Sequence, residues 1–205
     1  AAWVWHPDVP AGEETALLFR NEFSLPEARS ITIHVSADQR YELTLDDQLI
    51  SLGPDRGDLA HWSFASYEIQ LPAGKHRLEA VVAWIGDHAP FAQLSYRGGF
   101  ILAAEGDMAS QLNTGTEHWK TRRLQGWSFE PGPRPGFVGA KQTIDGSKWF
   151  APESGWKNPA VIYPALPNNE YGIMRPGWRL SPSPLPDQWL NVAQPGKDRA
   201  VFPGG

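Results

Sequence analysis

The segment ITIHVSADQRYELTLD, residues 31–46, alternates apolar and polar side chains in two successive stretches. Every second residue in each stretch is apolar: Ile31, Ile33, Val35, Tyr41, Leu43 and Leu45. A period of two is typical of strands that bury one face and expose the other. The segment therefore predicts two neighbouring β-strands, each with one buried face.

Further segments on both sides of residues 31–46 have strand character. They are residues 17–23, 76–85, 91–96, 100–104, 117–124 and 156–163. Turn signals separate them at intervals of about ten residues, which is typical of an antiparallel sandwich or barrel. Pro159 has no backbone N–H to donate, so it confines the last strand to a sheet edge. We predict an all-β chain with an antiparallel β-sandwich of the jelly-roll type.

The composition supports this fold class and excludes several others. Glycine (20) and proline (19) are frequent among the 205 residues, which argues against long helices, and we expect under about 15% helix. The hydrophobic fraction of 41% is too high for a disordered chain. The net charge of −5 argues against binding to nucleic acid or to anionic membranes. With no cysteine, disulfides and thiolate metal sites are excluded. No compartment is assigned: secreted, periplasmic and cytoplasmic locations all fit.

Proline and glycine become dense towards the C-terminus. We predict a sandwich domain over residues 1–165 and an extended connector over residues 166–205. Because the chain begins with Ala1 and not with Met, we expect it to be processed or cut from a longer protein.

The strand faces predict which side chains form the core. The expected buried residues are Ile33, Val35, Leu43, Leu45, Val82 and Trp84. Trp3 and Trp5 are expected to attach the N-terminus to a sheet. The other tryptophans considered lie in or beside loops, where they could bind sugar, cover a sheet edge or dock a neighbouring domain: Trp119, Trp127, Trp149 and Trp156.

No catalytic motif is present. The sequence lacks G-x-S-x-G, H-E-x-x-H, the phosphate-binding P-loop and G-x-G-x-x-G, and its six histidines show no paired spacing. We therefore expect no catalysis by this chain alone.

The densest polar cluster is GPDRGDLAHW, residues 53–62. Its candidate carbohydrate-binding residues are Asp55, Arg56, Asp58, His61 and Trp62. Charged planar groups can bond to vicinal hydroxyls while an indole covers the C–H face of a sugar ring. The alternative is a self-satisfied loop, in which Arg56 pairs with Asp55 or Asp58 and Trp62 packs underneath.

Calcium is a weaker possibility for this chain, because carboxylate oxygens are its usual ligands. The candidate ligands are Asp46, Asp47, Asp55, Asp58 and Asp145. No EF-hand spacing connects them, and no cofactor is firmly predicted.

A series of motifs occurs in order along residues 15–186. They are SADQRYEL (36–43), GPDRGD (53–58), HW (61–62), LPAGKHRLEAVVAW (71–84), APFAQLSYRGGF (89–100), EHWK (117–120), GWKNPA (155–160) and SPSPLP (181–186). In this order they resemble the N-terminal β-sandwich domain of bacterial α-L-rhamnosidases and related multidomain glycoside hydrolases. The resemblance implies a galactose-binding-like jelly roll and a catalytic (α/α)6 barrel further along the parent protein.

The chain also departs from this family. The rhamnose-binding modules carry an acidic GExYDxR motif, whereas the comparable segment GAKQTIDGSKW, residues 139–149, keeps only Asp145. A dedicated rhamnose pocket is therefore not predicted. The resemblance implies a non-catalytic ancillary domain, which binds carbohydrate weakly or braces its own catalytic domain. A purely structural interdomain module is the alternative, and a free-standing glycosidase is the least favoured one.

Overall fold

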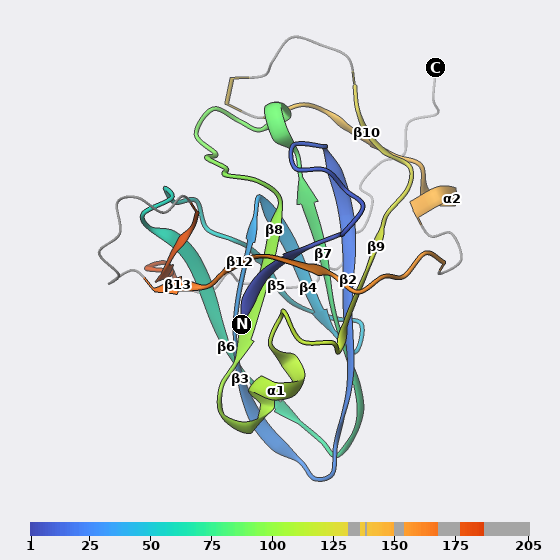
Figure 1. Cartoon of the computed structure of the whole chain (residues 1–205), viewed down its shortest axis with the longest axis vertical. Coiled ribbons are helices and arrows are strands. Elements are labelled where there is room, and N and C mark those ends of the chain that lie inside the picture. The colour runs from blue at the N-terminus through green and yellow to red at the C-terminus, as the bar shows by residue number, and fades with distance from the viewer. Residues whose placement is uncertain (131–135, 138, 150–153, 168–176, 187–205) are drawn as a thin grey trace, which may run out of the picture.

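The structure is a β-sandwich of two facing sheets (Figure 1). This computed structural model describes residues 1–130, 136–137, 139–149, 154–167 and 177–186. Strands account for 52% and helices for 8%, so the predicted all-β class and low helix content are confirmed. Within the described ranges, no helix is long and apolar enough to cross a membrane.

The larger sheet has seven strands in the order β12-β1-β8-β3-β6-β14-β13. Their bounds are β1 (Ala2–Trp5), β3 (Arg29–Asp38), β6 (Trp62–Leu71), β8 (Gly99–Ala104), β12 (Ala160–Pro164), β13 (Leu166–Pro167) and β14 (Arg179–Pro182). β14 pairs in parallel with both β6 and β13, whereas the other neighbours are antiparallel. β12 lies at the edge, as Pro159 predicts.

The smaller sheet is antiparallel and has the order β5-β4-β7-β2-β9. Its strands are β2 (Thr15–Leu25), β4 (Arg40–Leu45), β5 (Gln48–Gly53), β7 (Gly74–Trp84) and β9 (Trp119–Arg123). A separate hairpin joins β10 (Trp127–Phe129) to β11 (Gln142–Ile144). The helical turns are η1 (Gly86–His88), η2 (Gly106–Met108), α1 (Ala109–Leu112) and α2 (Gly146–Trp149).

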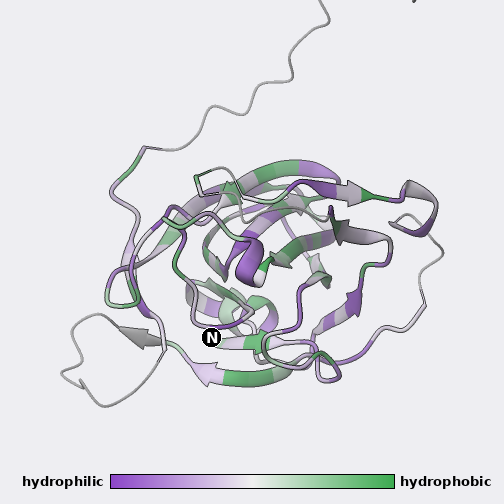
Figure 2. Ribbon diagram, turned by 90° about the horizontal axis from the view of Figure 1, so that it is seen from above, coloured by the Kyte–Doolittle hydropathy of each residue, from purple (hydrophilic) through white to green (hydrophobic). Residues whose placement is uncertain are grey.

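The core lies between the two sheets, where the apolar faces of β3 and β4 meet those of β2, β7 and β8. Figure 2 looks along the sandwich and shows hydrophobic stretches on strands of both layers. Five of the six predicted core residues are buried: Ile33, Val35, Leu43, Leu45 and Val82. The prediction for Trp84 is wrong, because this side chain is only partly buried at the end of β7. There its Nε1 donates to Ser95 Oγ at 2.9 Å.

Other strand predictions also need correction. Residues 91–96 form no strand, and the two strands β5 and β6 were not anticipated. Residues 127–129 form β10, although no strand was predicted there. Trp119 was expected in or beside a loop, yet it is fully buried in β9 and donates Nε1–H to the Leu112 carbonyl at 2.9 Å.

The C-terminal part contributes to the sandwich as well. Most of the predicted connector over residues 166–205 lies outside the described residues. Its described part includes β14, which pairs with β6, and Trp178, which is fully buried. The sandwich therefore draws on residues beyond 165.

The two long sides of the sandwich differ. On the β9 side, Thr121 and Lys157 exchange backbone hydrogen bonds of 2.8 and 2.9 Å, which connect β9 to the segment leading into β12. On the other side, β5 is the edge strand of its sheet and faces β6 without such a bridge among the described residues.

The turn between β4 and β5 is held by a buried histidine. Asp46 and Asp47 both have positive φ, 49° and 63°, the signs that a type I′ hairpin turn requires. His76 Nδ1 lies 2.8 Å from Asp46 Oδ2, and Nε2 lies 3.0 Å from the Pro72 carbonyl oxygen. Because both partners are acceptors, the protonated ring satisfies both contacts as a double donor.

Val82→Ala tests the assignment of the inner face. We expect a loss of about 1–3 kcal/mol in the free energy of unfolding, through lost burial and a residual cavity. Urea denaturation measures it. As the control, Val161→Ala on the exposed side of β12 should change stability by less than about 0.5 kcal/mol. A loss of only a few tenths for Val82→Ala would mean that the strand faces are reversed.

His76 makes stability depend on pH. Burial of the ring lowers its pKa, but the hydrogen bonds to Asp46 and Pro72 outweigh this and raise the pKa above 6.5. A raised pKa contributes stability that is complete below 6.5 and is lost as the pH rises through the folded-state value. We expect urea denaturation at a series of pH values to show this loss in the wild type and not in His76→Gln. His118→Gln, an exposed control, should keep the wild-type profile; a profile shared by all three proteins would contradict the assignment.

Candidate functional site

A buried carboxylate organises one end of the sandwich. Asp38, at the end of β3, is fully buried and accepts hydrogen bonds from Ser95 Oγ and the Tyr96 backbone N–H, both at 2.7 Å. It also accepts from Trp178 Nε1 at 2.9 Å and from the Arg97 N–H at 3.3 Å. Burial raises the pKa of Asp38 to about 6, although the four hydrogen bonds favour the carboxylate. The carboxylate thus ties the 91–97 loop and the C-terminal segment to the same point.

Trp178 is also the centre of an aromatic cluster. Its ring stacks on Trp3 at 4.0 Å between centroids, with 22° between the planes. Trp62 and Tyr163 meet it edge-on at 6.4 and 6.3 Å. The cluster covers the seven-stranded sheet at the same end of the molecule as Asp38.

The predicted polar loop, residues 53–62, lies beside this cluster. Two of its residues, Asp58 and His61, are hydrogen-bond partners of each other. Asp58 Oδ1 accepts from the Ala60 and His61 backbone N–H groups at 2.7 and 2.8 Å, and it lies 3.1 Å from His61 Nδ1. The hydrogen bond from His61 holds the pKa of Asp58 below its usual value. This part of the loop matches the self-satisfied alternative.

The other three predicted residues lie around one small hollow. Asp55, Arg56 and Trp62 line it together with Leu94, but its volume is only about 10 Å³, room for one water at most. Trp62 is 4% exposed, so its indole cannot serve as the stacking platform that was predicted.

Arg56 differs from the predicted alternative. Within the described part of the chain it has no ion-pair partner, so the expected pairing with Asp55 or Asp58 is absent there. Asp55 instead accepts a hydrogen bond from Ser183 Oγ, which connects the loop to the C-terminal segment. The loop is therefore fixed both by the hydrogen bonds of Asp58 within it and by the contact of Asp55 with Ser183, and Arg56 stays exposed.

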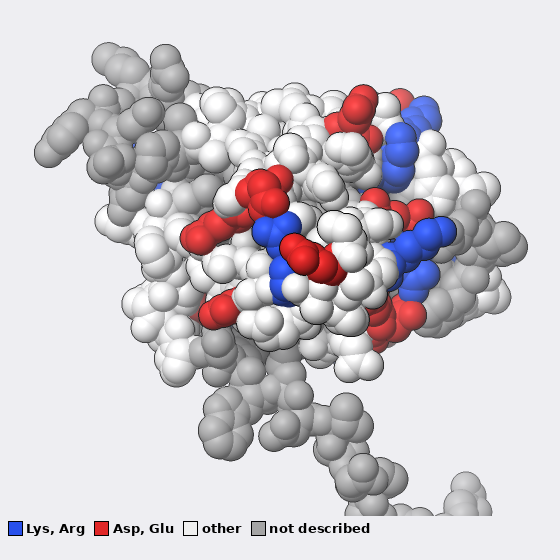
Figure 3. Space-filling model, turned by 90° about the horizontal axis from the view of Figure 1, so that it is seen from below, with Lys and Arg blue, Asp and Glu red and all other residues white. Residues whose placement is uncertain are grey.

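The loop that follows η1 exposes large apolar side chains. Phe91, Leu94 and Tyr96 are 66%, 51% and 39% exposed, and we call these three residues the loop-end patch. The opposite end of the sandwich instead shows interspersed acidic and basic groups (Figure 3). There Arg29 pairs with Asp107 at 2.7 Å and Arg77 with Asp47 at 2.5 Å.

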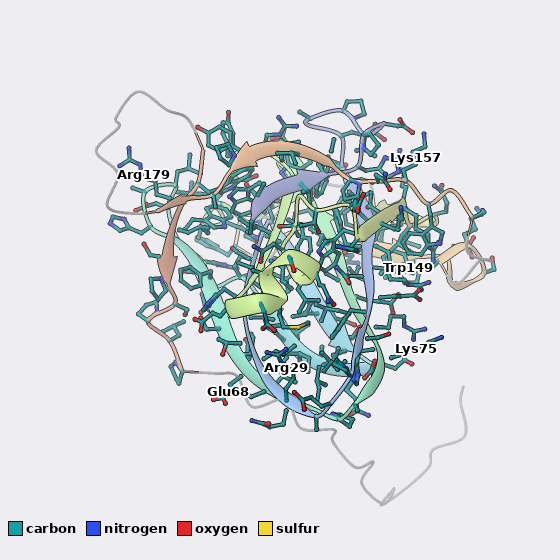
Figure 4. All side chains as sticks on the ribbon, turned by 60° about the horizontal axis from the view of Figure 1, so that its bottom comes forward. Arg29, Glu68, Lys75, Trp149, Lys157 and Arg179 are labelled. Carbon is teal, nitrogen blue, oxygen red and sulfur yellow. The ribbon has the colours of Figure 1, made fainter. Side chains whose placement is uncertain are left out.

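The remaining loop tryptophans cover a sheet. Trp127, Trp149 and Trp156 pack on a small cluster around Leu18 on the outer face of the five-stranded sheet. The guanidinium carbons of Arg20 and Arg122 lie 4.7 and 5.5 Å from the Trp156 ring centroid. In Figure 4, Trp149 lies on the side of the molecule away from Arg179 of β14. These tryptophans therefore cover part of the outer face of the sheet, and not an edge as predicted.

The calcium candidates have other partners. Asp46 contacts His76, and Asp58 bonds to its own turn. Asp145 accepts from Ser147 Oγ and pairs with Lys148 at 3.3 Å. Nowhere in the described ranges do three or more histidine, aspartate or glutamate side chains come together as metal ligands would.

Asp38→Asn tests the buried carboxylate. The amide offers one acceptor oxygen in place of two and turns an N–H group towards donors. We expect a loss of about 1–3 kcal/mol in the free energy of unfolding, measured in urea, and a changed near-UV circular dichroism signal from Trp178. Asp107→Asn, which breaks an exposed ion pair, should change the free energy of unfolding much less than Asp38→Asn does. Equal effects of the two variants would contradict the role given to Asp38.

Comparisons with known proteins come from solved structures. No protein-family model matches the sequence, and no curated protein matches it. A GH78 family rhamnosidase of Bacillus sp. GL1 superposes with a TM-score of 0.70 and 26% identity, covering 91% of this chain and 20% of that chain. The α-L-rhamnosidase of Dictyoglumus thermophilum gives 0.57 and 17%, covering 88% and 22%.

A third match is the α-L-rhamnosidase of Aspergillus terreus, with a TM-score of 0.54 and 18% identity, covering 79% of this chain and 21% of that chain. The last two matches show a shared fold, and the first adds sequence similarity. The chain spans about a fifth of the length of these proteins. The resemblance predicted from the motifs is thereby confirmed: this chain is similar to one β-sandwich domain of the α-L-rhamnosidases.

Proposed function

We propose that the chain is a non-catalytic ancillary domain that braces the catalytic domain of a rhamnosidase-type glycoside hydrolase. The observation that carries this proposal is the loop-end patch. Exposed apolar side chains gathered in one loop are typical of surfaces that another protein covers. Phe91, Leu94 and Tyr96 expose between 39% and 66% of their surface at one end of the sandwich.

The patch is held in place before any partner binds. The backbone next to it is fixed by the hydrogen bonds that Tyr96 and Arg97 donate to Asp38, and Gln93 Nε2 donates to the Gln39 carbonyl at 3.1 Å. A surface that is already ordered loses little conformational entropy on association. This rigidity favours a docking surface over a loop that closes on a ligand.

The polar groups around the patch suit a protein partner. Arg56 is exposed and shares a hollow with Leu94, so its guanidinium lies next to the patch. Arginine beside apolar side chains is frequent in protein interfaces. By contrast, a sugar site in the 53–62 loop would need an accessible aromatic face, and Trp62 is buried.

The double variant Phe91→Ser/Leu94→Ser tests the brace. The partner is the (α/α)6 catalytic domain that we expect in the same reading frame, produced separately. Calorimetric titration of the 205-residue chain against it should show binding that weakens at least about tenfold in the variant, because truncated interface anchors commonly cost more than 1 kcal/mol each.

Leu49→Ser is the matched control, because Leu49 is 43% exposed on β5 and lies outside the patch. It should leave the affinity unchanged, and all variants should keep the wild-type thermal transition. A reading frame without such a domain, or equal affinities for the patch and control variants, would overturn the proposal.

A further inference from the structure

On the side of the sandwich where β5 faces β6, there is a cavity that the proposed function does not use. Residues of four segments line it: Tyr41 in β4, residues 52–55 at the end of β5, residues 64–67 in β6, and residues 182–186 at and after the end of β14. Its volume is about 180 Å³. We name it the side pocket, and we propose that it binds one neutral monosaccharide unit.

Two phenol groups in the pocket are held by one serine. Ser51 Oγ lies 3.0 Å from the Tyr41 hydroxyl and 2.8 Å from the Tyr67 hydroxyl. Burial raises the pKa of Tyr41, so this phenol stays neutral and can both donate and accept hydrogen bonds. Gly53 leaves the room that the ring of Tyr41 occupies, since a Cβ there would lie 2.7 Å from the phenol oxygen.

The rim carries a carboxylate. Asp55 accepts from Ser183 Oγ, and each carboxylate oxygen can accept more than one hydrogen bond. Asp55 is the one residue with a formal charge among the residues that line the pocket, all of them described. A ligand with several hydroxyl donors suits this site, and an anionic ligand does not, because a like charge next to Asp55 is unfavourable.

Aromatic surface accompanies these polar groups. Phe64 and Tyr67, both partly exposed, line the pocket, whereas the ring of Tyr41 is only 4% exposed and offers no stacking face. A sugar ring offers the matching combination of hydroxyl edges and C–H faces, and aromatic rings provide apolar contact area for such faces. The volume is below the range of about 300–1,000 Å³ that drug-sized ligands occupy, so one ring fits rather than an oligosaccharide.

The C-terminal segment completes the pocket from the far end of the sequence. The Ser183 N–H donates to the Phe64 carbonyl at 2.8 Å, next to the parallel pairing of β14 with β6. Trp178 anchors the same segment to Asp38. Ser183 is therefore fixed against Asp55, and the rim exists before a ligand arrives.

The test is a heteronuclear NMR titration of the 205-residue chain with L-rhamnose, D-galactose and D-galacturonate. D-galacturonate carries a carboxylate that D-galactose lacks, so comparing their affinities distinguishes binding of a neutral sugar from binding of an anionic one. We expect saturable amide shifts in residues 52–55, 64–67 and 182–186 with a neutral sugar. The dissociation constant should be about millimolar, as suits one small site, and D-galacturonate should bind at least about tenfold more weakly.

Variants distinguish the side pocket from the 53–62 loop. Asp55→Ala should weaken binding of the neutral sugar about tenfold or more, because hydrogen bonds to charged groups are the strong ones. His61→Ala is the matched control from the same loop and should leave the affinity unchanged. Tyr67→Phe keeps the ring and removes only the hydroxyl, so a several-fold loss there supports the pocket even if Asp55→Ala loosens the C-terminal segment.

Three results would overturn the inference. They are the absence of saturable shifts up to about 50 mM of both neutral sugars, equal binding of D-galactose and D-galacturonate, and shifts confined to residues 56–61 that disappear in His61→Ala. Phe91→Ser/Leu94→Ser lies outside the pocket and should leave the titration unchanged, so failure of the brace and failure of the pocket give different results.

Discussion

The hydrogen bonds to the buried Asp38 carboxylate are the interaction on which the rest of the molecule depends. A carboxylate without partners in a protein interior is strongly unfavourable, and here four donors from two distant parts of the chain approach it. Trp178 lies 140 residues away in sequence, yet its indole N–H reaches the same oxygen as the Tyr96 N–H. The position of the exposed loop and that of the C-terminal segment are consequently set by one group.

The anchoring of Trp178 explains the unusual edge of the seven-stranded sheet. A parallel strand needs a long return through the chain, and β14 begins beside β6 directly after Trp178, whose ring is stacked on Trp3. The same strand brings Ser183 to Asp55 and so builds the side pocket. Strand pairing, aromatic packing and the pocket rim therefore depend on one another.

The sequence predicts most of the sandwich because period-two patterns are local. β2, β3, β4 and β7 were all anticipated from alternation, and Pro159 correctly predicts that β12 is an edge strand. Residues 91–96 show where this reasoning fails. Their pattern resembles that of a strand, but the backbone N–H groups of Tyr96 and Arg97 bond to a carboxylate and not to a neighbouring strand.

The candidate site was harder to predict, because its decisive contacts are non-local. Trp62 belongs to a polar cluster in sequence, and nothing near it indicates that Trp178 would cover it. Asp55 was chosen for its charge, and its partner Ser183 lies 128 residues further along. The period-two alternation of residues 62–71 was a local signal for β6, but it was overlooked beside the more conspicuous polar loop.

The two ends of the sandwich present different side chains to a neighbouring domain. At one end, charged side chains pair with each other, as Arg29 does with Asp107. Such exposed pairs are already solvated and gain little from a partner. At the other end, Phe91 and Leu94 are exposed to water although the backbone beneath them is rigid. Because covering apolar surface is favourable and covering paired charges is not, a neighbouring domain gains most by packing on the loop end. A domain that packs there would leave the side pocket, which lies between β5 and β6, open to the sugar that we propose for it.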